Sequence, residues 1–176
     1  MNYPALAFLF LNLHGGYMKT AYINVVLQEV PGEIAIALSF TGCPMQCDGC
    51  HSPELRNPEL GEKFTVEEFI KKLESYNGLL SCALFVGGDW NEQCLIEYMD
   101  IALIHGLKVC LYTGKTEVSD SIMQRLTYLK TGAWNKEVGG LNSPKTNQKM
   151  KNVKTGEDIT SMFNRIVSPS FKEIYA

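Results

Sequence analysis

The hydrophobic positions of this chain fall into two alternating patterns, one typical of buried strands and one typical of amphipathic helices. The strand pattern consists of short, nearly continuous apolar or β-branched runs, such as EIAIALSF at residues 33–40. The first run ends at Pro31 and Gly32, which predicts a turn after it. Strands are predicted in this way at residues 22–30, 33–40, 83–86, 108–112 and 128–130.

The helical pattern appears between these runs, where apolar residues recur every three or four positions. Thr65 and Glu68 have the spacing of a capping box, which predicts a helix that begins after Thr65 and ends before Gly78. Its apolar positions are Val66, Phe69, Ile70 and Leu73. A second helix is predicted at residues 91–105, closed by Gly106, and a short third helix at residues 119–126.

Strands that alternate with helices predict an α/β protein with a parallel sheet and right-handed crossovers. A complete eightfold barrel takes about 250 residues, or roughly 31 for each strand and helix. The 176 residues here have room for about five or six such units. The pattern therefore predicts either a partial, laterally open barrel or an open doubly wound sheet. Both place ligands at the carboxyl ends of the strands.

The composition argues against a nucleic-acid-binding protein and against a secreted, disulfide-rich protein. The formal net charge is −3, so no overall positive field indicates a nucleic-acid partner. Three of the six cysteines fall within eight residues, unlike the dispersed cysteines of a secreted disulfide scaffold. The other three, Cys82, Cys94 and Cys110, lie in apolar segments and are predicted in the core. This usage indicates a reducing, cytoplasmic environment.

The beginning of the chain differs from the rest. Residues 4–13 (PALAFLFLNL) are apolar, but the run is too short to span a bilayer and lacks the charged start of a signal peptide. Met18 is a natural first residue. We therefore expect residues 1–17 to be an N-terminal extension or the result of a misassigned start, and residues 18–176 to form a single domain that is not membrane-bound. A membrane-associating tail is the alternative.

The strongest chemical signal is the run CPMQCDGC at residues 43–50. Cys43, Cys47 and Cys50 have C-x3-C-x2-C spacing, and three such thiolates can hold three corners of a [4Fe–4S] cluster, leaving one iron open. A structural zinc site is an alternative, but it needs four ligands and His51 directly follows Cys50. An ordinary electron-transfer cluster is another alternative.

This spacing resembles that of the radical S-adenosylmethionine (radical SAM) enzymes. Further motifs are similar to those of the activating proteins of anaerobic (class III) ribonucleoside-triphosphate reductases: FTGCP at residues 40–44, GGD at 87–89, KTG at 130–132 and GGLNSPKTNQ at 139–148. The similarity covers roughly residues 20–155. It implies an open, about three-quarter parallel β/α barrel of the radical SAM type. It also implies that S-adenosylmethionine chelates the open iron and is cleaved to methionine and a 5′-deoxyadenosyl radical.

The resemblance also implies which residues bind this cofactor. Gly87, Gly88 and Asp89 correspond to a Gly-Gly-Glu element whose backbone accepts hydrogen bonds from the methionine ammonium group. Asp89 is one methylene shorter than the usual Glu, so its side chain reaches less far toward the cofactor. A plain turn from strand to helix is the alternative reading of these three residues.

The adenine is expected beside the cysteine loop. Many radical SAM enzymes carry an aromatic residue at the place of Gly49, and the reductase activators resemble this chain in having glycine there. Backbone groups from Gly49 through Cys50 to His51 are expected to contact the adenine, with packing from His51. His51 as a solvent-facing residue is the alternative. Thr113 is expected either to bond the nucleoside or simply to end a strand.

The partner implied by the resemblance is the large glycyl-radical subunit of the reductase, with an electron donor such as flavodoxin. Residues 134–148 form either a surface loop or a partner-facing segment. A basic run follows, which is either solvated or docks on an acidic patch: Lys145, Lys149, Lys151 and Lys154. The alternatives are activation of a formate-lyase type enzyme, a small-molecule radical enzyme such as a deazapurine carboxylate synthase, and an iron–sulfur electron carrier.

Overall fold

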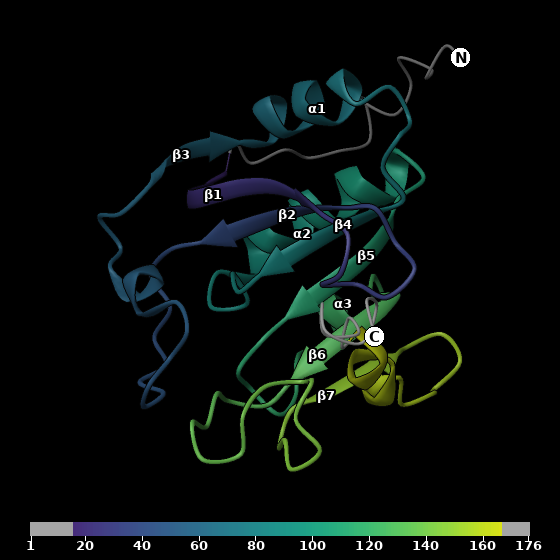
Figure 1. Ribbon diagram of the computed structural model, residues 1–176. Coiled ribbons are helices and arrows are strands. Elements are labelled where there is room, and N and C mark those ends of the chain that lie inside the picture. The colour runs from purple at the N-terminus through teal and green to yellow at the C-terminus, as the bar shows by residue number, and fades with distance from the viewer. Residues whose placement is uncertain (1–15, 167–176) are drawn as a thin grey trace, which may run out of the picture.

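A seven-stranded sheet forms the centre of the molecule (Figure 1). The computed structural model describes residues 16–166, so most of the predicted extension, residues 1–15, lies outside the described residues. The strands are β1 (Tyr17–Val26), β2 (Ala35–Phe40), β3 (Glu62–Thr65), β4 (Cys82–Val86), β5 (Lys108–Tyr112), β6 (Tyr128–Thr131) and β7 (Lys149–Asn152). Their order in the sheet is β3-β1-β2-β4-β5-β6-β7, with β3 and β7 at the edges. The predicted open α/β architecture is confirmed.

The prediction that the whole sheet is parallel is wrong for its outer strands. The four central strands β2, β4, β5 and β6 are parallel, whereas β1, β3 and β7 pair antiparallel with their neighbours. Residues 27–34 are too few for the crossover that a parallel pair of β1 and β2 would need, so these strands form a hairpin-like pair. β3 and β7 were not predicted because four-residue strands rich in lysine or glutamate lack an apolar run.

Two longer helices and one short helix connect the strands: α1 (Val66–Ser75), α2 (Glu92–Ile104) and α3 (Asp120–Met123). The predicted capping box is confirmed, since the Glu68 amide donates to Thr65 Oγ1 at 3.2 Å and the Thr65 amide donates to the Glu68 carboxylate at 2.7 Å. α3 is shorter than the predicted helix at residues 119–126, and Ser119 caps its start by accepting from the Ile122 amide. Within residues 16–166, no helix has both the length and the apolar character needed to cross a bilayer.

Both faces of the central strands are buried. The face toward α1 and α2 carries an aromatic cluster in which Phe40, Phe69, Phe85 and Tyr98 pack ring against ring. The other face carries Cys82 and Cys110, which are fully buried as predicted, while Cys94 is only half-buried. Burial raises the pKa of Cys82 to about 12, so this thiol stays protonated at neutral pH.

The register of the parallel strands decides where the loops meet. Ser39, Val86, Tyr112 and Lys130 lie in one row across β2, β4, β5 and β6. The segments that follow these residues therefore leave the sheet side by side, at the carboxyl ends of the four central strands. They are the cysteine loop, the Gly87–Asp89 turn, the loop after β5 and the loop after β6.

Candidate cofactor site

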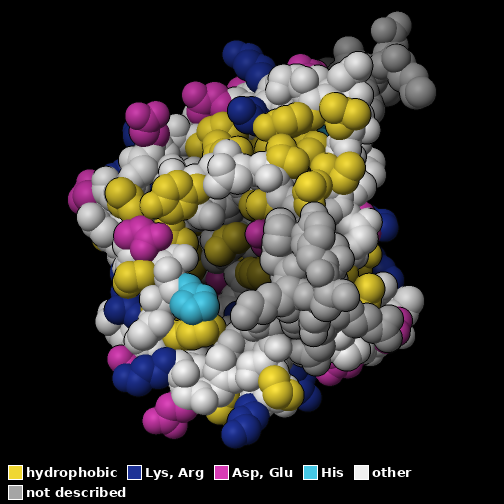
Figure 2. Space-filling model, viewed as in Figure 1, with side chains coloured by type: hydrophobic (Ala, Val, Ile, Leu, Met, Phe, Trp, Pro, Cys, Tyr) yellow, Lys and Arg dark blue, Asp and Glu magenta, His cyan; other side chains and the backbone are white. Residues whose placement is uncertain are grey.

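A cavity of about 670 Å³ opens at this edge of the sheet, within the usual size range of small-molecule sites. Figure 2 shows this face of the molecule hollowed at its centre, with hydrophobic side chains inside the hollow. The walls come from all four central strands and the loops after them. Apolar side chains such as Phe40, Met45 and Leu141 form much of the lining, next to a few charged ones.

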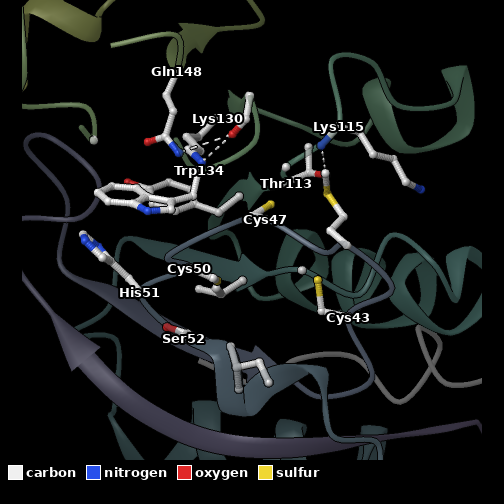
Figure 3. Close-up of a pocket in the computed structure, with 18 of the residues that line it drawn as sticks. Cys43, Cys47, Cys50, His51, Ser52, Thr113, Lys115, Lys130, Trp134 and Gln148 are labelled. Carbon is white, nitrogen blue, oxygen red and sulfur yellow. Dashed lines mark hydrogen bonds between the residues drawn. The ribbon is translucent and has the colours of Figure 1, made fainter. Parts of the chain in front are cut away.

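The three cysteines of the C-x3-C-x2-C run all line this cavity, and their thiols are free (Figure 3). Hydrogen bonds to the 3-10 helix that follows, Pro53–Arg56, hold the loop that carries these cysteines. The Cys43 amide donates to the Leu55 carbonyl at 3.0 Å, and the Arg56 guanidinium donates to the Cys47 carbonyl. The loop thus presents three sulfurs toward one space.

The electrostatics of the loop suit an iron–sulfur cluster. Burial raises the pKa of Cys43, and the nearby charges of Cys50, Cys47 and Asp89 raise it further, although a hydrogen bond from the Met45 backbone opposes them. Three thiolates this close repel one another, and bound iron removes that repulsion.

The three thiols can be compared with what a cluster needs. Across residues 16–166, no group of three His, Cys, Asp or Glu side chains that could hold a metal ion is found. Each cysteine of a cubane cluster binds a different iron. Three thiols that line one cavity fit the three-cysteine [4Fe–4S] cluster predicted from their spacing.

Asp89 lies on the wall next to the cysteines, and its side chain is only 4% exposed. Its Oδ2 accepts a hydrogen bond from Thr113 Oγ1 at 3.1 Å and pairs with Lys115 Nζ at 2.8 Å. The Lys115 ammonium also donates to the Asp89 carbonyl at 3.2 Å. A carboxylate oxygen and a backbone oxygen of the same residue therefore hold a primary ammonium group. The two predicted residues, Asp89 and Thr113, are brought together, whereas no sequence pattern singled out Lys115.

The predicted glycines have different roles. Gly87 lines the cavity with φ of 76°, and a Cβ there would lie 2.5 Å from the Trp90 ring. Gly88 does not line the cavity: it has φ of 93°, and a Cβ would lie 2.6 Å from the Phe40 ring. Any other residue at these two positions would strain the backbone and displace the rings.

Gly49 also lies outside the cavity lining, with φ of 64° in the cysteine loop. A Cβ there would lie 3.3 Å from Lys136 Cβ and 3.6 Å from Trp134 Nε1. The loop after β6 therefore packs directly on the cysteine loop. The Lys136 ammonium, which is 2.5 Å from Asp48 Oδ2, reinforces this contact.

His51 does line the cavity, and its ring stacks at a tilt on Trp134 with centroids 3.6 Å apart. Trp134 lines the same cavity and was not singled out from the sequence. Its segment has few apolar residues and was expected to be a surface loop or a partner-facing segment. The contact between His51 and Trp134 joins residues more than eighty positions apart, which no local pattern reveals.

Lys130 is a second residue that the sequence analysis did not assign to the site. It lines the cavity at the end of β6 and donates to the Gly132 carbonyl at 3.1 Å, as does Gln148 at 3.3 Å. Burial lowers the pKa of Lys130 to about 8, although Cys47 and Cys50 nearby raise it. A buried ammonium group here can neutralise an anionic group of a ligand.

Comparison with known proteins agrees with the chemistry of the cysteine loop. No curated protein matches this chain significantly. Among solved structures, the crystal structure of QueE from Escherichia coli is similar with a TM-score of 0.49 and 14% identity, over 63% of this chain and 69% of QueE. A family model described as a 4Fe-4S single cluster domain matches residues 31–130, which include the cysteine loop, Asp89, Thr113 and Lys130. The chain thus belongs to the family of 4Fe-4S single cluster domains.

Proposed function

We propose that this protein is a radical SAM activating enzyme that generates a glycyl radical on an anaerobic ribonucleoside-triphosphate reductase. The observation that carries the proposal is that the three cysteine thiols and the ammonium-binding oxygens of Asp89 open into one cavity. A cluster with one open iron would lie next to the Asp89 oxygens, which accept hydrogen bonds from an amino group. This combination suits a ligand that carries an amino-acid group.

Each residue of the site has a defined task in this proposal. When bound, the cluster and S-adenosylmethionine supply reductive cleavage to methionine and a 5′-deoxyadenosyl radical. Cys43, Cys47 and Cys50 hold three irons. Asp89 accepts hydrogen bonds from the methionine ammonium group, which takes the place of Lys115. Thr113 holds the Asp89 carboxylate in position by donating a hydrogen bond to it. These contacts would hold S-adenosylmethionine next to the cluster, so that its cleavage becomes an effectively unimolecular step.

The protein substrate is proposed from the sequence motif at residues 139–148 and from the position of its segment. The loop after β6 borders the cavity through Trp134, Gly140, Leu141 and Asn142, so a loop from a large partner would meet it at the mouth. We propose that the partner is the large glycyl-radical subunit of the reductase and that an electron donor such as flavodoxin reduces the cluster in the cytoplasm. In β7, Lys149 and Lys151 are exposed on both sides of the buried Met150, which suits either a solvated face or a docking one.

The test is an anaerobic activation assay. Reconstituted protein, dithionite and S-adenosylmethionine are mixed with the reductase subunit, and we expect a glycyl signal in electron paramagnetic resonance together with 5′-deoxyadenosine. The Cys47→Ala variant is the matched control and should give neither product. Production of 5′-deoxyadenosine without a glycyl signal would reject the proposed partner. Absence of both with a fully loaded wild-type cluster would reject the radical SAM activity itself.

A further inference from the structure

Trp134 has an unmet bonding requirement at the edge of the cavity. Its indole Nε1 is buried and has no hydrogen-bond partner. Buried tryptophan N–H groups usually find an acceptor, so an unpartnered one calls for an explanation. Trp134 also lines the cavity, but its N–H is closed off, so the part of the side chain that a ligand would meet is the indole ring.

The position of Trp134 next to the cysteine loop is fixed from several sides. Its ring stacks on His51, and its Nε1 lies against the backbone of Gly49. The ion pair between Lys136 and Asp48 joins the two loops two residues away. A side chain at residue 49 would have to displace Lys136, whose Cβ would be 3.3 Å away, so glycine there leaves room for the loop that carries the indole.

The cavity has two chemically different sides (Figure 3). Lys115 and Thr113 lie on one side with the buried carboxylate of Asp89, and they suit the charged amino-acid end of a ligand. Trp134 and His51 lie on the other side, near Cys50, and offer flat aromatic surfaces. A molecule that joins an amino acid to an aromatic base matches both sides.

We propose that Trp134, supported by His51, is the platform on which the adenine of S-adenosylmethionine stacks. This rests on the proposed function, since it assumes that the cofactor is S-adenosylmethionine. It adds that the aromatic surface for the base comes from the loop after β6, while residue 49 of the cysteine loop is glycine. Stacking on an aromatic side chain suits adenine because every base has a flat π-face, and it contributes measurably to affinity.

The test compares two ligands that differ in the base. Cluster-loaded wild type and variants are placed in equilibrium dialysis with labelled S-adenosylmethionine or labelled methionine, which lacks adenine. We expect Trp134→Ala to weaken S-adenosylmethionine binding about 5- to 100-fold. Methionine binding should stay within about twofold of wild type, because the groups at the other end of the cavity are intact. Trp134→Phe keeps a smaller stacking surface, so its loss of S-adenosylmethionine affinity should be less than about tenfold.

Three results would overturn the inference. Equal S-adenosylmethionine affinity in wild type and Trp134→Ala would show that the base does not stack there. Equal weakening of both ligands would show that Trp134 only supports the loop. A loss in Trp134→Phe as large as in Trp134→Ala would exclude stacking as the source of affinity. Tyr22→Ala, an exposed aromatic residue outside the cavity, is the matched control and should bind both ligands as wild type does. A wild-type chain that binds no S-adenosylmethionine would instead reject the proposed function.

Discussion

The two ends of the central strands carry nearly the same ion pair in different surroundings. At the carboxyl end, Asp89 pairs with Lys115 at 2.8 Å, with the side chains 4% and 44% exposed. At the opposite end, Glu33 pairs with Lys108 at 2.5 Å, with the side chains 4% and 50% exposed. Each carboxylate also accepts a hydroxyl hydrogen bond, from Thr113 in the first case and from Tyr128 in the second.

What differs is the space beside each carboxylate. Asp89 faces the cavity, so its half-exposed lysine can leave and a cationic group of a ligand can replace it. Glu33 does not line the cavity and lies close to the buried thiols of Cys82 and Cys110. A buried carboxylate without its partner is costly in either place. Similar ion pairs therefore differ in what can reach them: a ligand can approach the pair beside the cavity, whereas side chains enclose the other pair.

The largest expected difference between the two ends concerns their cysteines. Alanine at Cys43, Cys47 or Cys50 should abolish iron content and the visible absorption of the cluster, because each supplies one thiolate ligand. Serine at Cys82 or Cys110 should leave iron content unchanged and cost about 1–3 kcal/mol of unfolding free energy through burial of a hydroxyl. Iron analysis and urea denaturation measure both effects. Loss of iron in Cys82→Ser would contradict the ligand assignment.

Variants of the two carboxylates should differ in whether they lower cofactor affinity or the unfolding free energy. Asp89→Asn removes the charge that holds an ammonium group, so S-adenosylmethionine affinity should fall about 10- to 100-fold. Glu33→Gln should leave that affinity unchanged and lower the unfolding free energy by about 1–3 kcal/mol, since Lys108 loses its partner. Dialysis and urea unfolding of both variants make the comparison. A fall of affinity in Glu33→Gln as large as in Asp89→Asn would remove the distinction between the two ends.

The smallest effect is the pH dependence contributed by Glu33. Burial by itself raises the pKa of Glu33, but hydrogen bonds from Lys108, Ser81 and Tyr128 outweigh it and leave the pKa lowered. A carboxyl group with a lowered pKa in the folded state stabilises the fold above its unfolded pKa, near 4.3, and this contribution is lost as the pH falls through the lower folded value. Urea unfolding between pH 7 and pH 3 should therefore show that the unfolding free energy falls more steeply with falling pH in wild type than in Glu33→Gln. Parallel curves would contradict this role.

Much of the fold was predictable because its signals are local. The apolar runs located the four central strands, and Thr65 with Glu68 located the start of α1, since a capping box needs only residues three apart. The edge strands β3 and β7 were missed for the opposite reason. β3 and β7 have little apolar character of their own, and they are held by the neighbours they pair with.

The candidate groups of the site could be recognised from the order of residues alone: three cysteines at fixed spacing on one short loop, followed by Asp89 and Thr113 where strands end. Residue type and short-range spacing are present in the chain before it folds. Folding was needed to show that Lys115 pairs with Asp89, that Lys130 lies beside the thiols, and that Trp134 reaches the cysteine loop. Parallel strands in register bring distant loops to one edge, and contacts across that edge have no counterpart in the order of residues.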